Sequence, residues 1–211
     1  MLVDHLPLYG LRVRTPDLEL RLPDLPELAR LGDVAGEGVH DPGVMPFMHP
    51  WTQQSDVGRH VILSALAELG QWRPGDWSLG LVAFRDGEPV GRQILSAREF
   101  AVTREVRSWS WLGRRFHGQG LGTQMRTAVL ALAFDGLDAL SACSAAFLDN
   151  HSSLRVSEKL GYQPDGIQVD AVRGAPTISR RLRLTRERWS QHSRVPVEIE
   201  GLDPCREMFG A

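Results

Sequence analysis

The sequence predicts a mixed α/β fold in which one sheet and its flanking helices form a single domain. Three observations support this prediction: alternating strand-like patterns joined by tight-turn residues, separate segments with helical leucine spacing, and the order in which they occur. Helices come first, then a strand meander, then strand–helix–strand–helix–strand, which is typical of α/β proteins. The 211 residues suit one large domain. We therefore expect residues 1–211 to be one unit, with a core of about 15–185 and a C-terminal extension of 186–211.

The first third of the chain predicts one strand and two helices. Residues 18–22 alternate leucine with charged residues, as a half-buried strand does. Pro23-Asp24 then opens a helix that carries leucines at helical spacing. Residues 36–52 are rich in glycine, proline, histidine and methionine, which predicts a long loop, and residues 55–69 return to helical spacing.

The middle of the chain predicts a strand meander. Asp86-Gly87 is a strong signal for a two-residue hairpin between the strands 77–84 and 89–95. We expect a third strand over 101–112, with Trp109 and Trp111 on one face and two serines on the other.

The last part alternates strands and helices. A glycine-rich segment, 113–122, follows the third strand and leads into an amphipathic helix. The further elements that we expect are a strand over 139–148, a helix over 152–160 ended by Gly161, a hairpin of 162–172 and 177–184, a helix over 185–192 and an added strand over 195–199.

Charge and composition narrow the classes of function. Lys and Arg total 24 and Asp and Glu total 26, so no excess positive charge favours nucleic acid or an acidic membrane. Two cysteines and scattered histidines form neither a disulfide framework nor a metal-ligand motif. The N-terminus lacks a signal-peptide pattern, and the longest apolar run, 128–134, is too short to span a bilayer. We expect a soluble cytoplasmic protein without a metal ion.

The glycine-rich segment carries the strongest functional signal. A glycine turn between a strand and a helix presents backbone N–H groups at the positive end of the helix dipole, and such a site binds phosphate. The spacing of Gly113 and Gly118 fits a P-loop, but Gln119-Gly120 stands where Lys and Ser/Thr are needed. A dinucleotide-binding motif is a weak match because these glycines lie deep in the chain, after a meander. A plain tight turn needs fewer glycines than are present.

Two segments resemble signatures of the GNAT acyltransferases. The sequence His117-Gly-Gln-Gly-Leu-Gly122 resembles the Gln/Arg-x-x-Gly-x-Gly/Ala motif on which these enzymes hold the pyrophosphate of acyl-coenzyme A. The segment from Asp149-Asn150 to Gly161-Tyr162 is similar to the family's second signature, a strand-end asparagine followed by a helix. The resemblance covers about 15–185 and is closest to the RimJ/RimL-like branch. Within that branch, further segments are similar to succinyltransferase-like members from mycobacteria.

The resemblance implies a fold, a cofactor and a set of binding residues. The fold is a mixed, largely antiparallel central sheet, splayed at a V-shaped cleft and flanked by helices. The cofactor is acetyl-CoA or succinyl-CoA, and the acceptor is an amine of a small molecule or a protein, with the oligomeric state left open. The positions implied to bind the cofactor are Trp111, Leu112, Arg114, Arg115, His117, Gly118, Gln119, Gly120, Leu121, Gly122, Thr123, Asn150 and Ser153.

Two departures from the family pattern affect the site. His117 replaces Gln or Arg in the loop motif, and Arg114 and Arg115 either supply the missing charge or form a solvated turn. Ser157 stands where many members have a tyrosine that protonates the departing thiolate. The RimL-like branch resembles Asn-x-x-Ser, which implies Ser153 as the proton donor and Ser157 as second choice. Either serine has the alternative role of a helix cap or a packing residue.

The other catalytic roles are less specific. Asn150 is implied to orient the pantetheine arm or the proton donor, and a backbone N–H near Trp111 to stabilise the thioester oxygen. Glu105 and the His40-Asp41 pair are the candidates for a general base, although a lone strand glutamate is more often a surface residue. Two other classes of function remain open: an acyl-CoA-binding sensor without catalysis, favoured by Ser157, and a dinucleotide-dependent oxidoreductase.

Overall fold

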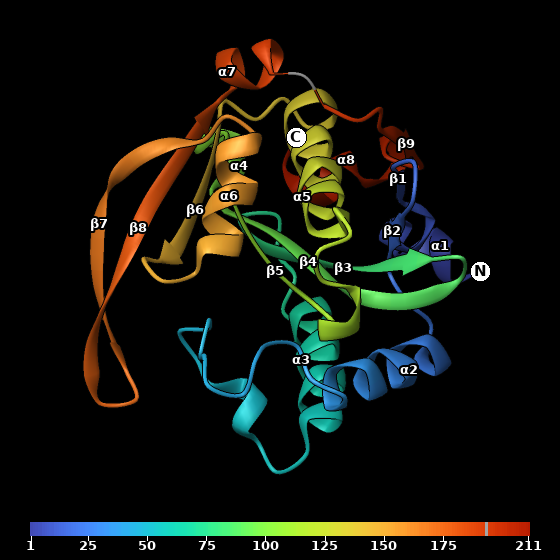
Figure 1. Ribbon diagram of the computed structural model, residues 1–211. Coiled ribbons are helices and arrows are strands. Elements are labelled where there is room, and N and C mark those ends of the chain that lie inside the picture. The colour runs from blue at the N-terminus through green and yellow to red at the C-terminus, as the bar shows by residue number, and fades with distance from the viewer. Residues whose placement is uncertain (193) are drawn as a thin grey trace.

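One mixed sheet forms the centre of the computed structural model, which describes residues 1–192 and 194–211 (Figure 1). Within these residues nine strands have the order β7-β8-β6-β5-β4-β3-β2-β1-β9. Neighbouring strands are antiparallel except for β5 and β6, which confirms the predicted mixed, largely antiparallel sheet. The strands are β1 (Arg12–Arg14), β2 (Glu19–Arg21), β3 (Asp76–Arg85), β4 (Glu88–Arg98), β5 (Glu105–Leu112), β6 (Ser141–Phe147), β7 (Gln163–Val172), β8 (Ala175–Thr185) and β9 (Glu198–Glu200).

Helices cover both faces of the sheet. The helix α5 packs with α6 on one face of the central strands, and α2 and α3 pack together on the other face (Figure 1). In the described part of the chain, none of the helices is long and apolar enough to cross a membrane. The helices are α1 (Leu2–His5), α2 (Leu25–Gly36), α3 (Val57–Gly70), α4 (Phe100–Thr103), α5 (Leu121–Ala131), α6 (His151–Lys159), α7 (Arg186–Gln191) and α8 (Arg206–Phe209).

The strand β5 presents different side chains to the two helical layers. Its register pairs Trp111 with Arg92 and Ser108 with Leu95 on β4, so the tryptophans and the serines lie on opposite faces, as the alternation predicts. Trp111 packs with the α2–α3 layer, whereas Leu95 belongs to the core beneath α5. Ser108 therefore faces the α5 side.

The strands β5 and β6 separate along their length. They pair only over Glu105–Arg107 and Ser141–Cys143, although β5 continues to Leu112 and β6 to Phe147. We call the unpaired edges of residues 108–112 and 144–147 the splay (Figure 1). It lies where the resemblance implied a V-shaped cleft. The glycine-rich loop follows one of its edges along the chain, and α6 follows the other.

The predicted third strand begins later than expected. Residues 100–103 form the helical turn α4 instead, and the strand starts at Glu105. Glu99 and Arg104, which flank the turn, both have a positive φ of 48°, and the Phe100 side chain is fully buried. Burial of this ring outweighs the local strand pattern. The Asp86-Gly87 hairpin is confirmed, because both residues have the positive φ that a type I′ turn requires.

Both ends of the chain pack on the sheet. The C-terminal extension contains the expected strand, but β9 covers Glu198–Glu200 instead of 195–199. It pairs with β1, a short strand that the sequence pattern did not reveal. The indole N–H groups of Trp72 and Trp77 donate to the backbone oxygens of Met208 and Phe209, at 2.9 and 3.1 Å. The extension is thus part of the folded core.

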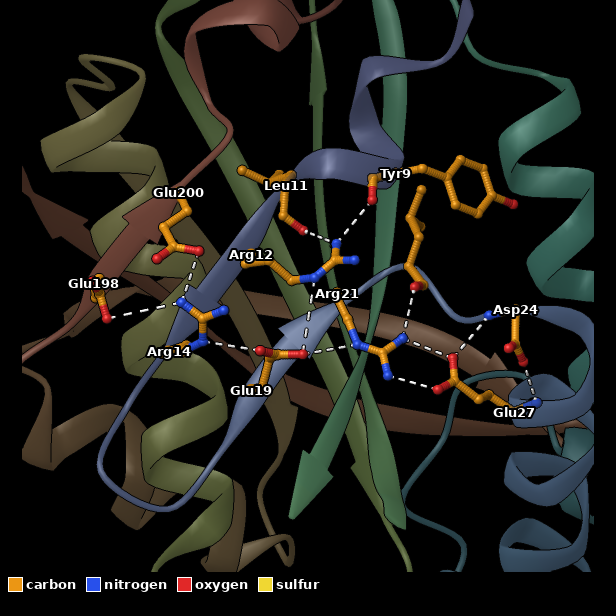
Figure 2. A network of polar contacts seen from close by, with 11 residues as sticks. Tyr9, Leu11, Arg12, Arg14, Glu19, Arg21, Asp24, Glu27, Glu198 and Glu200 are labelled. Atoms are coloured by element: carbon orange, nitrogen blue, oxygen red, sulfur yellow. Dashed lines mark hydrogen bonds and ion pairs between the residues drawn. The ribbon is translucent and has the colours of Figure 1, made fainter. Parts of the chain in front are cut away.

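Ion pairs tie β2 to the first turn of α2 (Figure 2). Arg21 on β2 contacts both oxygens of Glu27 in the first turn of α2, at 2.6 and 2.7 Å. Glu27 also accepts a hydrogen bond from the N–H of Asp24, whose side chain caps the same helix. Hydrogen bonds from Arg21 lower the pKa of Glu27 to about 2, although burial acts in the opposite direction.

Candidate active site

The loop before α5 exposes a row of backbone donors. Gly118 and Gly120 have positive φ values of 75° and 80°, and Gly120 is the N-cap of α5. Across residues 1–192 and 194–211, no group accepts a hydrogen bond from the backbone N–H groups of 118–122. A Cβ added at Gly118, Gly120 or Gly122 would meet nothing within 4 Å, so the space beside the loop is open. Open donors at a helix N-terminus form a cradle for an anion such as a pyrophosphate.

Arginines border this loop and already have partners. Arg115 forms an ion pair with Glu37, and Arg114 lies 4.0 Å from Asp41, with about half of each arginine side chain exposed. Gln119 accepts a hydrogen bond from Arg85 at 2.7 Å and donates one to the Arg115 oxygen. The acidic residues reduce the net charge that the two predicted arginines offer, but both guanidinium groups remain beside the loop.

The His117 side chain, at the first position of the loop motif, contacts the end of β5. Its Nε2 lies 2.9 Å from the backbone oxygen of Leu112, at the end of β5. The ring therefore ties the loop to the strand. The backbone donors of 118–122 remain the groups that face the open space.

The unpaired edge of β5 supplies donors to the splay. The N–H of Gly113 donates to Val90 on β4 at 2.9 Å. Because bonded and non-bonded pairs alternate in an antiparallel ladder, the N–H of Trp111 is also directed to β4. The same alternation directs the N–H groups of Ser110 and Leu112 away from β4, toward the splay. These two, rather than Trp111, are the donors available to a thioester oxygen.

The first turn of α6 begins at the other edge of the splay. The Asn150 side chain caps this helix, because its Oδ1 accepts a hydrogen bond from the N–H of Ser153 at 3.1 Å. The Asn150 NH₂ group remains for another partner. The Ser153 hydroxyl is half-buried and has no hydrogen-bond partner in the described chain. Asn150 and Ser153 thus lie together at the start of α6, as their spacing predicts.

Ser157 has a different environment from Ser153. Its side chain is buried, donates to the Ser153 backbone oxygen at 3.0 Å and accepts from Arg126 at 2.8 Å. Both hydrogen bonds hold Ser157 inside the protein. The buried Arg126 was not recognised from the sequence; the only signal was a charged residue within the apolar stretch of α5.

Glu105 lies at the closed end of the splay. Its carboxylate forms an ion pair with Arg183 on β8 and accepts a hydrogen bond from the Ser141 hydroxyl at 3.0 Å. Burial raises the pKa of Glu105, but these hydrogen bonds outweigh it and leave the pKa below its ordinary value. A paired carboxylate with a lowered pKa is a weak proton acceptor.

Aromatic rings lie on the α3 side of β5. The Trp51 ring is 5.6 Å from Trp111 and 5.9 Å from His60, measured between ring centroids. His40 is 5.8 Å from Phe47 and bonds the Thr52 hydroxyl through Nε2 at 2.8 Å. The long loop after α2 thus brings His40 into one aromatic cluster with Trp111. His60 joins this cluster and was not predicted.

Comparisons with known proteins identify the family. Residues 17–163 match the family model described as an acetyltransferase (GNAT) domain. RimJ from Mycobacterium smegmatis, solved with a CoA disulfide, is 19% identical, with a TM-score of 0.68 over 86% of this chain and 90% of that chain. A RimL ribosomal α-N-protein acetyltransferase in complex with coenzyme A is 18% identical, with a TM-score of 0.59 over 81% of this chain and 95% of that chain.

A further similar structure acts on a different kind of amine. The spermidine/spermine N-acetyltransferase SpeG from Vibrio cholerae is 12% identical, with a TM-score of 0.61 over 83% of this chain and 97% of that chain. These similarities concern the fold, whereas the family model covers most of the chain. The chain therefore belongs to the GNAT acetyltransferase family, and its fold is similar to the folds of RimJ, RimL and SpeG.

Proposed function

We propose that the protein is an N-acyltransferase that moves an acetyl or succinyl group from coenzyme A to an amine. The observation that carries this proposal is the row of five open backbone donors, 118–122, beside the splay. The donors suit the diphosphate of coenzyme A, and the unpaired β5 edge suits the amide-containing pantetheine arm. Thr123, in the first turn of α5, and the two arginines Arg114 and Arg115 complete the proposed cofactor site.

The chemistry begins with a neutral amine. Its lone pair forms a C–N bond to the thioester carbon, and the carbonyl oxygen becomes negative. The N–H groups of Ser110 and Leu112 would stabilise this oxygen, because both are directed into the splay. An acceptor that is an ammonium ion must first lose a proton, by way of a water molecule or a general base. Among the predicted bases we favour His40 over Glu105, because the partners of its two ring nitrogens are the Asp41 backbone oxygen and the Thr52 hydroxyl, whereas Glu105 is held by a guanidinium.

Collapse of the intermediate completes the transfer. The carbonyl double bond re-forms, the C–S bond breaks, and its electron pair goes to sulfur, while the extra proton on the nitrogen passes to water or to the general base. We assign Ser153 as the group that protonates the thiolate, since its hydroxyl has no other partner in the described chain. Asn150 holds the first turn of α6, and its NH₂ group is available to the pantetheine arm.

The acyl group and the acceptor are separate questions. The family name favours acetyl, whereas the sequence resemblance to succinyltransferase-like members favours succinyl. Among similar structures, the printed acceptors are a ribosomal protein and the polyamines spermidine and spermine. We propose a primary amine of a protein or a small molecule.

A second candidate is an acyl-CoA-binding sensor without catalysis. The observation that favours it is Ser157, which replaces the family's tyrosine and has both of its hydrogen bonds inside the protein. A sensor would bind acyl-CoA and leave the thioester intact in the presence of amines.

Mass spectrometry of the purified protein tests the cofactor assignment. We expect co-purified coenzyme A or an acyl-CoA, whose mass also identifies the acyl group. A thermal shift should follow addition of coenzyme A but not NAD. A shift with NAD alone would contradict the proposal and favour the oxidoreductase.

A further inference from the structure

A buried arginine lies between α5 and α6 without a negative partner. The Arg126 side chain is 5% exposed, and one terminal nitrogen donates to the Ser157 hydroxyl at 2.8 Å. In the part of the chain that the structure describes, its Nε has no hydrogen-bond partner. Within residues 1–192 and 194–211, no carboxylate lies within ion-pair distance of it. Burial lowers the pKa of Arg126, with Tyr162 acting in the opposite direction, but a guanidinium stays protonated in proteins. The fold therefore carries an uncompensated positive charge.

Two more buried groups near Arg126 lack partners. The hydroxyls of Tyr162 and Ser108 are buried, and within the described residues neither makes a hydrogen bond of good geometry. Burial raises the pKa of Tyr162, while Arg126 and the nearby Ser108 hydroxyl act in the opposite direction. Ser108 is the first β5 residue beyond the last β5–β6 pair, and it faces the α5 side. The Ser108 hydroxyl, one of these buried groups, thus lies next to the closed end of the splay, where β5 and β6 separate. Tyr162 is the titratable side chain that faces Arg126, and Cys143 on β6 lies beyond it.

The connection to the proposed site runs through α6. Arg126 holds the Ser157 hydroxyl, and Ser157 in turn donates to the backbone oxygen of Ser153. Two hydrogen bonds therefore link the buried charge to the backbone of Ser153, one helical turn before Ser157. The N-terminus of α6 adds a partial positive charge at the same place. Both features favour a negative charge that arises beside Ser153.

The reaction itself supplies such a charge. When the C–S bond breaks, the sulfur of coenzyme A keeps the electron pair. It is a thiolate until it receives a proton. We propose that Arg126 is a positioning residue whose buried charge stabilises this thiolate. This inference rests on the proposed function. It also explains how the enzyme works without the family's tyrosine, since a stabilised thiolate depends less on an acid.

Titration of the bound cofactor tests the inference directly. Free coenzyme A is bound to the unaltered protein, binding is confirmed by calorimetry, and the ultraviolet absorbance of the thiolate is followed against pH. A nearby positive charge lowers the pKa of a thiol, whose ordinary value is about 8.5, and we expect a decrease of about one unit or more. Bound coenzyme A with an ordinary or raised thiol pKa would overturn the inference but not the proposed function. Absence of binding would overturn both.

Variants separate charge from structure. Arg126→Met should raise the pKa of the bound thiol by about one unit relative to the unaltered protein, and Arg126→Lys should keep it low, because only the first variant removes the charge. Ser157→Ala removes the hydrogen bond but not the charge, so the thiol pKa should stay low. Arg155→Met is the matched control, since it removes an exposed charge from α6. Equal thiol pKa values in Arg126→Met and the unaltered protein would overturn the inference. A rise of the thiol pKa in Ser157→Ala as large as that in Arg126→Met would also overturn it.

Discussion

Ser153 and Ser157 occupy successive turns of α6 and have different hydrogen bonds. Ser153→Ala should lower kcat by up to about 10²–10⁴-fold. The acyl-CoA affinity should change little, because the hydroxyl interacts with the leaving sulfur only in the transition state and not in the bound acyl-CoA. Steady-state kinetics with calorimetry measures both quantities. The prediction fails if Ser153→Ala turns over at the parent rate.

Ser157→Ala provides the contrast on the same helix. It removes the acceptor for a buried guanidinium N–H, which costs about 1–3 kcal/mol of stability. We expect a lower Tm, by about 2–12 °C, and a smaller loss of kcat than for Ser153→Ala. A larger kinetic effect at Ser157 than at Ser153 would identify Ser157 as the proton donor.

Among the loop glycines, Gly122 can be substituted with the least backbone strain, so it is the best position at which to test the phosphate cradle. Its φ is not positive, unlike those of Gly118 and Gly120, and a Cβ there meets nothing within 4 Å. Gly122→Val should therefore leave the fold intact but place a side chain where the diphosphate binds, and weaken coenzyme A binding at least about tenfold. Calorimetry measures the affinity and circular dichroism the fold. Gly36→Val, at the end of α2 and equally open, is the matched control. Unchanged affinity in folded Gly122→Val would contradict the loop assignment.

At the scale of elements, the start of α2 depends on an ion pair that is sensitive to acid. The folded-state pKa of Glu27 is lowered to about 2, so its contribution to stability is complete above pH 4.5 and is lost as the pH falls toward 2. Glu27→Gln should lower the Tm at pH 7 by about 3–6 °C, for a loss of about 1.5 kcal/mol. Thermal denaturation from pH 7 to pH 2 should show the parent and the variant converging. A difference in Tm that is independent of pH would contradict the assignment.

Elements with local signals could be predicted from the sequence. The helix α6 begins after the Asn150 cap and ends at Lys159, two residues before Gly161, whose φ is +87°; both signals act within a few positions along the chain. The Asp86-Gly87 hairpin and the loop before α5 are equally local. The turn α4 was missed because burial of Phe100 against distant residues decides it. The same holds for the site residues. The sequence pattern placed Glu105 on the correct strand, but its ion pair with Arg183, 78 positions away, leaves no local signal in the sequence.

At the scale of the molecule, the C-terminal extension completes the core. The Phe209 ring is fully buried and lies 4.9 Å from Trp77 and 5.4 Å from Trp72, between ring centroids. Phe209→Ala should cost about 3–5 kcal/mol, or a decrease in Tm of about 6–20 °C, with coenzyme A affinity unchanged below the transition. Thermal denaturation and calorimetry check the two parts. A Tm within about 2 °C of the parent would show that the extension is dispensable.

The central claim is that the glycine-rich loop and the splay together transfer an acyl group from coenzyme A to an amine. The most direct measurement is the rate of free coenzyme A release from acetyl-CoA and succinyl-CoA, with and without a panel of peptide N-termini, lysine side chains and polyamines. We predict release that depends on an amine, an acylated product of matching mass, and a decrease of both in Gly122→Val at acyl-CoA concentrations below saturation. Tight acyl-CoA binding without amine-dependent release across the panel would contradict the claim and identify the protein as a sensor.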